Sequence, residues 1–212
     1  MTLEKVILYL GFLLALSSPA IAETVYTANE KDHSISVISW PTRNDDFSVP
    51  IPVMPHNIDI SAQAGYILVT GMPHKLHAEA VGYLLVFDHA KIKKGAVASI
   101  EVGLHPAHVV ADAKGQKAYV TLSGENAVAV VDLPSFKVVK KIPVGKYPHG
   151  LRFSADGLSI YVANMGEDTI SIIDSVKEAE AEKIVVGSKP VQVAVTPDGS
   201  LLYASLNDEN KI

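Results

Sequence analysis

The sequence predicts an all-β protein, a β-propeller of four-stranded antiparallel blades, and three observations support this fold class. Identical residues recur at a step of 42 residues, as at Gly103, Gly145 and Gly187, and further columns of Pro, Gly and Tyr keep the same step. Each unit holds four short runs rich in Val, Ile and Tyr, bounded by Gly, Pro, Asp or Asn, which is the pattern of strands and turns. No stretch has a convincing helical period. Four strands in about forty residues make one propeller blade.

The clearest unit spans residues 145–186. Its first expected strand, 149–154, ends at a tight Ala-Asp-Gly turn in which Gly157 is free to take a positive φ. The other three strands are expected at 158–164, 169–174 and 181–186. These strands are apolar on both faces, as expected for a blade that is packed between two neighbours.

The earlier units are more diverged, and the chain does not begin or end at a blade boundary. Residues 55–70 match 106–121 at an offset of 51, with an insertion at 72–81. Residues 26–29 match 161–164, so the first blade is expected to start at its second strand. Ile212 falls inside an expected third strand. We therefore count about four and a half blades and expect a C-terminally incomplete piece of a seven-bladed ring; the alternative is a complete short chain that closes by oligomerising.

Residues 1–22 have the pattern of a secretory signal peptide. Lys5 precedes an uncharged apolar run at 6–16, and Ala20-Ile21-Ala22 is a small-x-small cleavage site. The run is too short to span a bilayer, which needs about twenty residues. We expect cleavage after Ala22, a propeller domain over 23–212, no remaining membrane span, and a periplasmic or extracellular location. The alternative is an uncleaved N-terminal anchor.

Composition excludes several classes of function. The chain has no cysteine, which removes disulfides, thiol nucleophiles and cysteine-ligated metals. A net charge of −5 gives no indication of nucleic-acid binding. The sequence has no nucleophile elbow, no phosphate-binding glycine loop and no CxxCH haem attachment motif. We assign no catalytic residue, and the sequence favours a protein that is not an enzyme.

Residues 141–174, KIPVGKYPHGLRFSADGLSIYVANMGEDTISIID, resemble the YVTN-family β-propeller repeat. The matches are Tyr161-Val162-Ala163-Asn164 and the turn Thr196-Pro197-Asp198-Gly199, whereas Leu122 stands where the repeat has Asn. The resemblance covers 23–212 and is strongest after residue 100. It implies the propeller fold. The family and its relatives include cell-surface proteins, DNA- or protein-binding periplasmic propellers, lactonases, and the cofactor-bearing propellers of nitrous-oxide and nitrite reductases, the latter of the cytochrome d1 type.

Seven of the eight histidines map to one face of the expected disc. Strand direction alternates within a blade, so the loops from strand four to strand one and from strand two to strand three share this face, which we call the upper face. The histidines on it are His33, His56, His74, His77, His105, His108 and His149. First strands line the central channel, so His56, His108 and His149 are expected to converge near its mouth as cofactor ligands. His105 is a further candidate metal ligand, as are His74 and His77 in the insertion. The alternative is ordinary surface histidines in loops.

Three hypotheses for function follow. The first is a binding or scaffold propeller that presents its upper face to a protein or small-molecule ligand. The second is a redox or cofactor-handling propeller, with haem or copper held by histidine near the channel, which the family resemblance implies is possible. The third is a lactonase-like hydrolase, although no metal-binding carboxylate set is found. Asp59 and Arg152 share an inner-strand column and are interpreted as solvating or charging the channel.

Overall fold

The chain is described by a computed structural model for residues 23–74 and 80–212, and this part is almost entirely β-strand. The signal-peptide prediction therefore lies outside the described residues. The strands are β1 (Glu23–Asn29), β2 (Ser34–Trp40), β3 (Phe47–Pro50), β4 (Met54–Ser61), β5 (Tyr66–Met72), β6 (Val81–Asp88), β7 (Ala98–Leu104), β8 (Pro106–Ala111), β9 (Lys117–Leu122), β10 (Ala127–Asp132), β11 (Lys137–Pro143), β12 (Pro148–Phe153), β13 (Ser159–Asn164), β14 (Thr169–Asp174), β15 (Ala179–Val185), β16 (Pro190–Val195) and β17 (Leu202–Leu206). A short 3₁₀ helix, η1 (His89–Lys94), follows β6.

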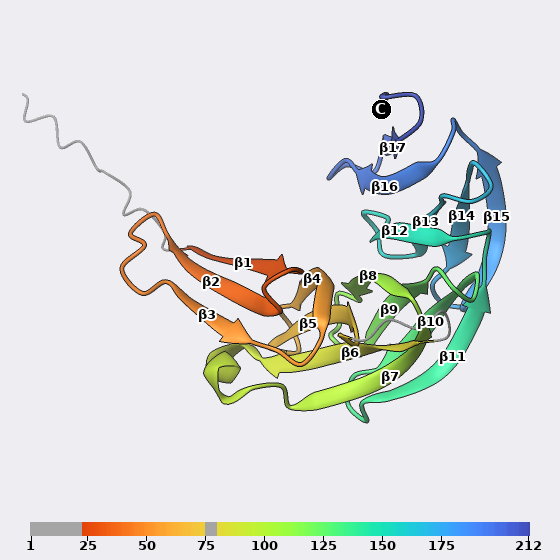
Figure 1. Cartoon of the computed structure of the whole chain (residues 1–212). Helices are drawn as coiled ribbons and strands as arrows, with labels where there is room; N and C mark the ends of the chain where they lie inside the picture. The colour runs from red at the N-terminus through yellow and green to blue at the C-terminus, as the bar shows by residue number, and fades with distance from the viewer. Residues whose placement is uncertain (1–22, 75–79) are drawn as a thin grey trace, which may run out of the picture.

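The strands form consecutive antiparallel sheets that follow one another around an open arc (Figure 1). Three sheets are complete blades, β4–β7, β8–β11 and β12–β15, each with its strands in chain order. A three-stranded sheet, β1–β3, stands at one end of the arc and a two-stranded sheet, β16–β17, at the other. The predicted fold class, a propeller of which about four and a half blades are present, is confirmed.

The hydrophobic core is divided into layers, one between each pair of neighbouring blades. One layer joins Leu68 and Leu84 of the second sheet to Val109 and Val120 of the third. A similar layer joins Val110 and Tyr119 of the third sheet to residues of the fourth, and two further layers join the terminal sheets to their neighbours. Because each blade buries both of its faces, its strands carry apolar residues on both sides, as the sequence indicates.

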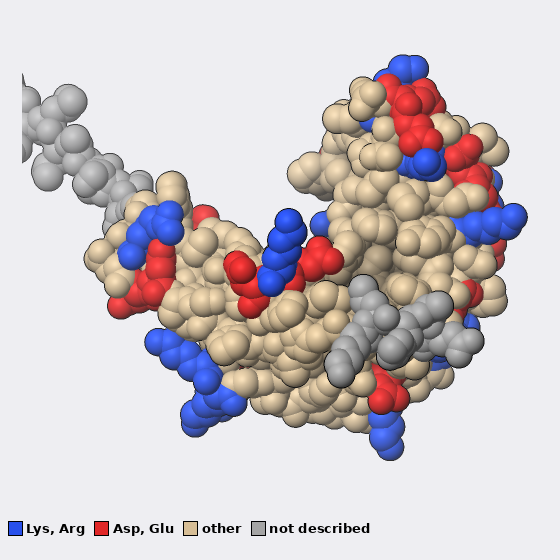
Figure 2. All heavy atoms as spheres, in the orientation of Figure 1, with Lys and Arg blue, Asp and Glu red and all other residues tan. Residues whose placement is uncertain are grey.

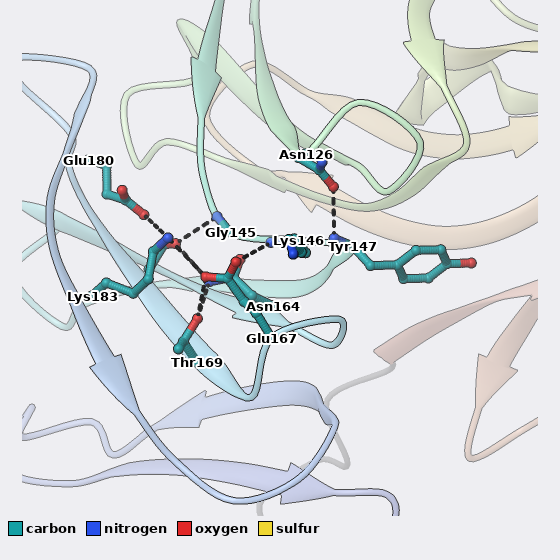
Figure 3. Close-up of polar contacts among 10 residues, drawn as sticks. Asn126, Gly145, Lys146, Tyr147, Asn164, Glu167, Thr169, Glu180 and Lys183 are labelled. Atoms are coloured by element: carbon teal, nitrogen blue, oxygen red, sulfur yellow. Dashed lines mark hydrogen bonds and ion pairs between the residues drawn. The ribbon is translucent and has the colours of Figure 1, made fainter.

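A buried polar cluster replaces apolar packing at the top of the fourth blade (Figure 3). The amide nitrogen of Asn164, which is fully buried, donates to the hydroxyl of Thr169 at 2.9 Å and to the hydroxyl of Ser171 at 2.8 Å. Ser171 in turn accepts the backbone N–H of Gly145 at 3.2 Å. The Asn of the repeat thus holds the second and third strands to the loop that enters the first strand.

Charged side chains lie along the arc in small groups of both signs, and Figure 2 shows no continuous basic area on the face in view. Most of the ion pairs join lysine to a nearby carboxylate, such as Lys141 to Glu125 at 2.6 Å. Within residues 23–74 and 80–212, no helix is long and apolar enough to cross a membrane.

Candidate metal-binding site

Three histidines from three successive blades come together on the upper face. His56 lies on β4, His108 on β8 and His149 on β12, and these are the innermost strands of their blades. β8 packs against both β4 and β12, which sets the three strands side by side. The ligand nitrogens of the three imidazoles all lie within 4.8 Å of one another. The convergence expected at the channel mouth is therefore present.

Backbone irregularities explain how these three side chains reach the same point. His56 and His149 occupy equivalent repeat positions, but His108 stands one position later and would face the opposite side of a regular strand. In each inner strand the pairing register shifts at this level, between Pro55 and Asn57, between Pro106 and Val109, and between Pro148 and Leu151. A β-bulge re-aims the side chains beside it. The bulges thus allow His108 to point into the same site as His56 and His149, although it stands one repeat position later.

The imidazole rings are in direct contact. The Nε2 atoms of His56 and His149 are 3.3 Å apart. The His108 ring centroid lies 4.8 Å from that of His149 and 5.6 Å from that of His56. Two nitrogens bound to one tetrahedral metal ion at 2.0–2.1 Å are about 3.3–3.4 Å apart, so the His56–His149 spacing is that of a ligand pair.

Two of the three imidazoles lie in surroundings that favour their neutral form. Burial lowers the pKa of His108 from 6.5 to about 3, with further lowering from His149, His56 and the positive charge of Arg152. Burial also lowers the pKa of His149, with a contribution from His56, although the bond to the Val191 carbonyl opposes it. Neutral imidazole is the form that binds a metal ion. His108 and His149 are therefore held in the neutral form at neutral pH.

Two groups outside the triad fix the positions of its members. Nδ1 of His149 lies 3.1 Å from the backbone oxygen of Val191, which can only accept, so this nitrogen carries the proton and Nε2 has the lone pair. The buried hydroxyl of Thr121 donates to the backbone oxygen of His149 at 2.6 Å and accepts the backbone N–H of His108 at 2.9 Å. Thr121 thereby ties β8 to β12 at the level of the triad.

The loops that enter the inner strands are held by carboxylates in repeat-equivalent positions. Glu125 accepts the backbone N–H of Leu104 at 2.8 Å, and Glu167 accepts that of Lys146 at 3.0 Å. Glu209 accepts that of Ser188 at 2.8 Å, again one repeat later. Asn126 adds a bond from the backbone N–H of Tyr147 at 3.0 Å, as Figure 3 shows. These bonds hold the loops that enter β8, β12 and β16 to neighbouring loops of the upper face.

A pocket of about 190 Å³ opens beside the triad. Three of its lining residues, Met54, His105 and Tyr147, occupy the same repeat position in successive blades and come from the loops that enter the first strands. The lining residues are Glu30, Met54, His56, Met72, His105, Pro106, Ala107, Ser123, Tyr147 and His149. Both kinds of upper-face loop contribute, so the pocket belongs to the face that the repeat predicts for ligand binding.

The remaining predicted ligands lie elsewhere. His105 is in the pocket wall but outside the close group of three nitrogens. His74 packs against His33, with ring centroids 4.0 Å apart, and is not part of the triad. His77 lies outside the described residues. Asp59 accepts the backbone N–H of Ala111 at 3.0 Å, and its pKa is raised by burial despite the nearby Arg152 charge.

The residues present fit a metal ion better than a haem. Three imidazoles with an open fourth position form a ligand set that suits zinc, copper, iron or nickel. The pocket is smaller than the usual 300–1,000 Å³ of organic-ligand sites. Its lining contains one carboxylate, Glu30, and no Lys or Arg to pair with the acidic side chains of a haem. The described part of the chain therefore offers a site for an ion and a small additional ligand.

Sequence reasoning missed the residues around the triad. Gln192, Thr121, Met54 and Met72 were not singled out, because no motif marks a side chain that reaches a neighbouring blade. A signal exists in the repeat itself: Gln192 stands two repeats after His108, in the same column.

Comparisons with known proteins show the fold alone. No family model matches the sequence, and a search of curated proteins finds no match. Among solved structures, the chain is similar to a protein of unknown function from Desulfotomaculum acetoxidans, with TM-score 0.72 and 15% identity over 88% of this chain and 62% of that one. It is also similar to hydrazine synthase of Kuenenia stuttgartiensis, with TM-score 0.65 and 24% identity over 72% of this chain and 42% of that one.

A third similar structure is the dihydro-haem d1 dehydrogenase NirN in complex with DHE. The TM-score is 0.61 and the identity 17%, over 86% of this chain and 40% of that one. The chain thus spans between 40% and 62% of the length of these structures. These similarities support the propeller fold.

Proposed function

We propose that this chain is a periplasmic or extracellular propeller of the YVTN type, whose upper face binds a transition-metal ion through His56, His108 and His149. The observation that carries the proposal is the 3.3 Å separation of the His56 and His149 Nε2 atoms, with the third imidazole beside them. The signal-peptide pattern of residues 1–22 supports the location. The YVTN assignment rests on the repeat columns.

The protein's own residues account for binding and orientation. The Val191 carbonyl fixes the tautomer of His149, and Thr121 fixes the spacing of β8 and β12. A bound ion would supply Lewis acidity or, for copper or iron, electron transfer. The pocket lined by Met54, His105 and Tyr147 lies beside His56 and His149, and at about 190 Å³ it suits a small molecule rather than a macrocycle. This combines the binding-module and cofactor-handling hypotheses in one site.

The experiment is a titration of the metal-free mature protein with Cu(II), Zn(II) and Co(II), followed by calorimetry and, for Co(II), by visible absorption. We expect one ion per chain and a loss of affinity of roughly 100-fold or more in His149→Ala, since even the groups behind metal ligands are worth 10- to 100-fold. His89→Ala, which removes an imidazole that packs against Tyr26 away from the triad, is the matched control. Equal affinity in the wild type and His149→Ala would reject the proposal.

A further inference from the structure

Gln192 reaches the triad from the next blade along the arc. It lies on β16, and its side-chain nitrogen is 3.4 Å from Nδ1 of His108, which is on β8. Between them lies β12, where Gly150 is buried. A Cβ at position 150 would be 2.1 Å from Oε1 of Gln192, so the absence of a side chain at Gly150 makes room for the Gln192 amide.

The hydrogen bonds assign the orientation of this amide. Oε1 of Gln192 accepts the backbone N–H of Val193 at 3.1 Å. The amide nitrogen therefore faces His108, and because it has only donors, Nδ1 of His108 must accept. A neutral imidazole has one donor and one acceptor nitrogen, so the proton of His108 is on Nε2.

His108 and His149 consequently have opposite tautomers. His149 carries its proton on Nδ1, because the Val191 carbonyl can only accept, so its Nε2 has the lone pair. Nε2 of His56 therefore donates to Nε2 of His149 across 3.3 Å. His56 is exposed, so water can move this proton to its Nδ1 when an ion arrives. In His108 both nitrogens are engaged: Nδ1 accepts from Gln192 and Nε2 is protonated.

We propose that Gln192 is a positioning residue that withholds His108 from the metal ion by holding it in the tautomer that lacks a free ligand atom. The inference rests on the proposed function of the triad as a metal site. It makes His56 and His149 the primary ligands and His108 a conditional third ligand, whose engagement requires the Gln192 hydrogen bond to break. The affinity of the site is thereby lower than three unrestrained imidazoles would give.

Two substitutions test this assignment with and without a change of charge. In Gln192→Leu the hydrogen bond is lost without added charge, and we expect the Cu(II) affinity to rise several-fold. In Gln192→Glu a carboxylate accepts from Nδ1 of His108 and frees Nε2, and we expect a rise of roughly 10- to 100-fold. Gln63→Glu, an exposed substitution in the β4–β5 turn with the same change of charge, is the control and should leave the affinity unchanged.

A second readout needs no metal. Two-bond ¹H–¹⁵N correlation spectra of the metal-free protein should show His108 protonated on Nε2 in the wild type and on Nδ1 in Gln192→Glu. A wild-type His108 protonated on Nδ1, or a Gln192→Leu variant that binds more weakly, would overturn the inference. If the affinity falls in His149→Ala but does not respond to Gln192, only this inference fails; if the affinity ignores His149 as well, the proposed function fails with it.

Discussion

The buried cluster around Asn164 should be replaceable as a set but not one residue at a time. The preceding blade has Leu122, Ala127 and Ala129 where the fourth blade has Asn164, Thr169 and Ser171, so the chain contains a polar and an apolar version of the same position. All six residues are buried. The perturbation is Asn164→Leu alone, compared with the triple variant Asn164→Leu, Thr169→Ala, Ser171→Ala.

The expected magnitudes follow from the hydrogen bonds. Asn164→Leu removes the donors to Thr169 and Ser171, at 2.9 and 2.8 Å, and leaves two buried hydroxyls with one partner fewer each. At about 1 kcal/mol for each lost bond and more where a buried group is left unpaired, we expect a loss of about 2–3 kcal/mol in the free energy of unfolding. The triple variant removes both sides of these bonds and leaves the Gly145 N–H without its 3.2 Å partner. It also removes the Thr169 hydroxyl that donates to Glu167 at 2.9 Å, but that carboxylate keeps its ion pair with Lys183, so we expect a loss of about 1 kcal/mol.

The assay is urea denaturation of the full chain, followed by circular dichroism, for the single and triple variants. The reverse change, Leu122→Asn, serves as the control, because it buries an amide between two alanines and should destabilise more than Asn164→Leu. The reasoning is refuted if the triple variant is less stable than Asn164→Leu, since the energies would then add as independent losses instead of compensating.

The remaining predictions concern the triad. Thr121→Val should lower the free energy of unfolding by about 1–3 kcal/mol and the metal affinity about 10-fold, because the bonds to the His149 oxygen and the His108 N–H are both lost. An unchanged affinity by calorimetry would count against this role of Thr121. The metal-free protein should lose stability as the pH falls from about 6.5 toward 3, because the pKa of His108 is about 3 in the folded state and near 6.5 when unfolded, so the unfolded chain binds the proton first. His108→Gln should flatten this slope in urea titrations from pH 7 to 4, and an unchanged slope would show that His108 is not buried in this way.

The sequence predicts the fold well because the repeat is long and regular. The 42-residue columns locate the strands from β8 onward, and the match at an offset of 51 locates β4 and β5. The partial match of residues 26–38 places β1 and β2 as the second and third strands of a blade. The same columns place His56 and His149 on equivalent inner strands. Periodicity is sufficient here because each element repeats the same pattern of apolar residues and turns.

The details of the site could not be predicted in the same way. His108 faces the other two histidines only because bulges shift the register of the inner strands, and neither Pro55 nor Pro148 is a sequence signal for that shift. The bond between Gln192 and His108 crosses an intervening strand at Gly150, so it joins residues 84 positions apart. Such contacts depend on the packing of blades, which no local pattern encodes.

The most direct test of the metal site is an anomalous difference map from crystals of the mature protein grown with Cu(II), with data collected at the copper absorption edge. The account predicts one principal peak within about 2.0–2.1 Å of the Nε2 atoms of His56 and His149, with His108 beside it. A principal peak at His33 and His74, or no ordered peak on the upper face at saturating copper, would contradict it.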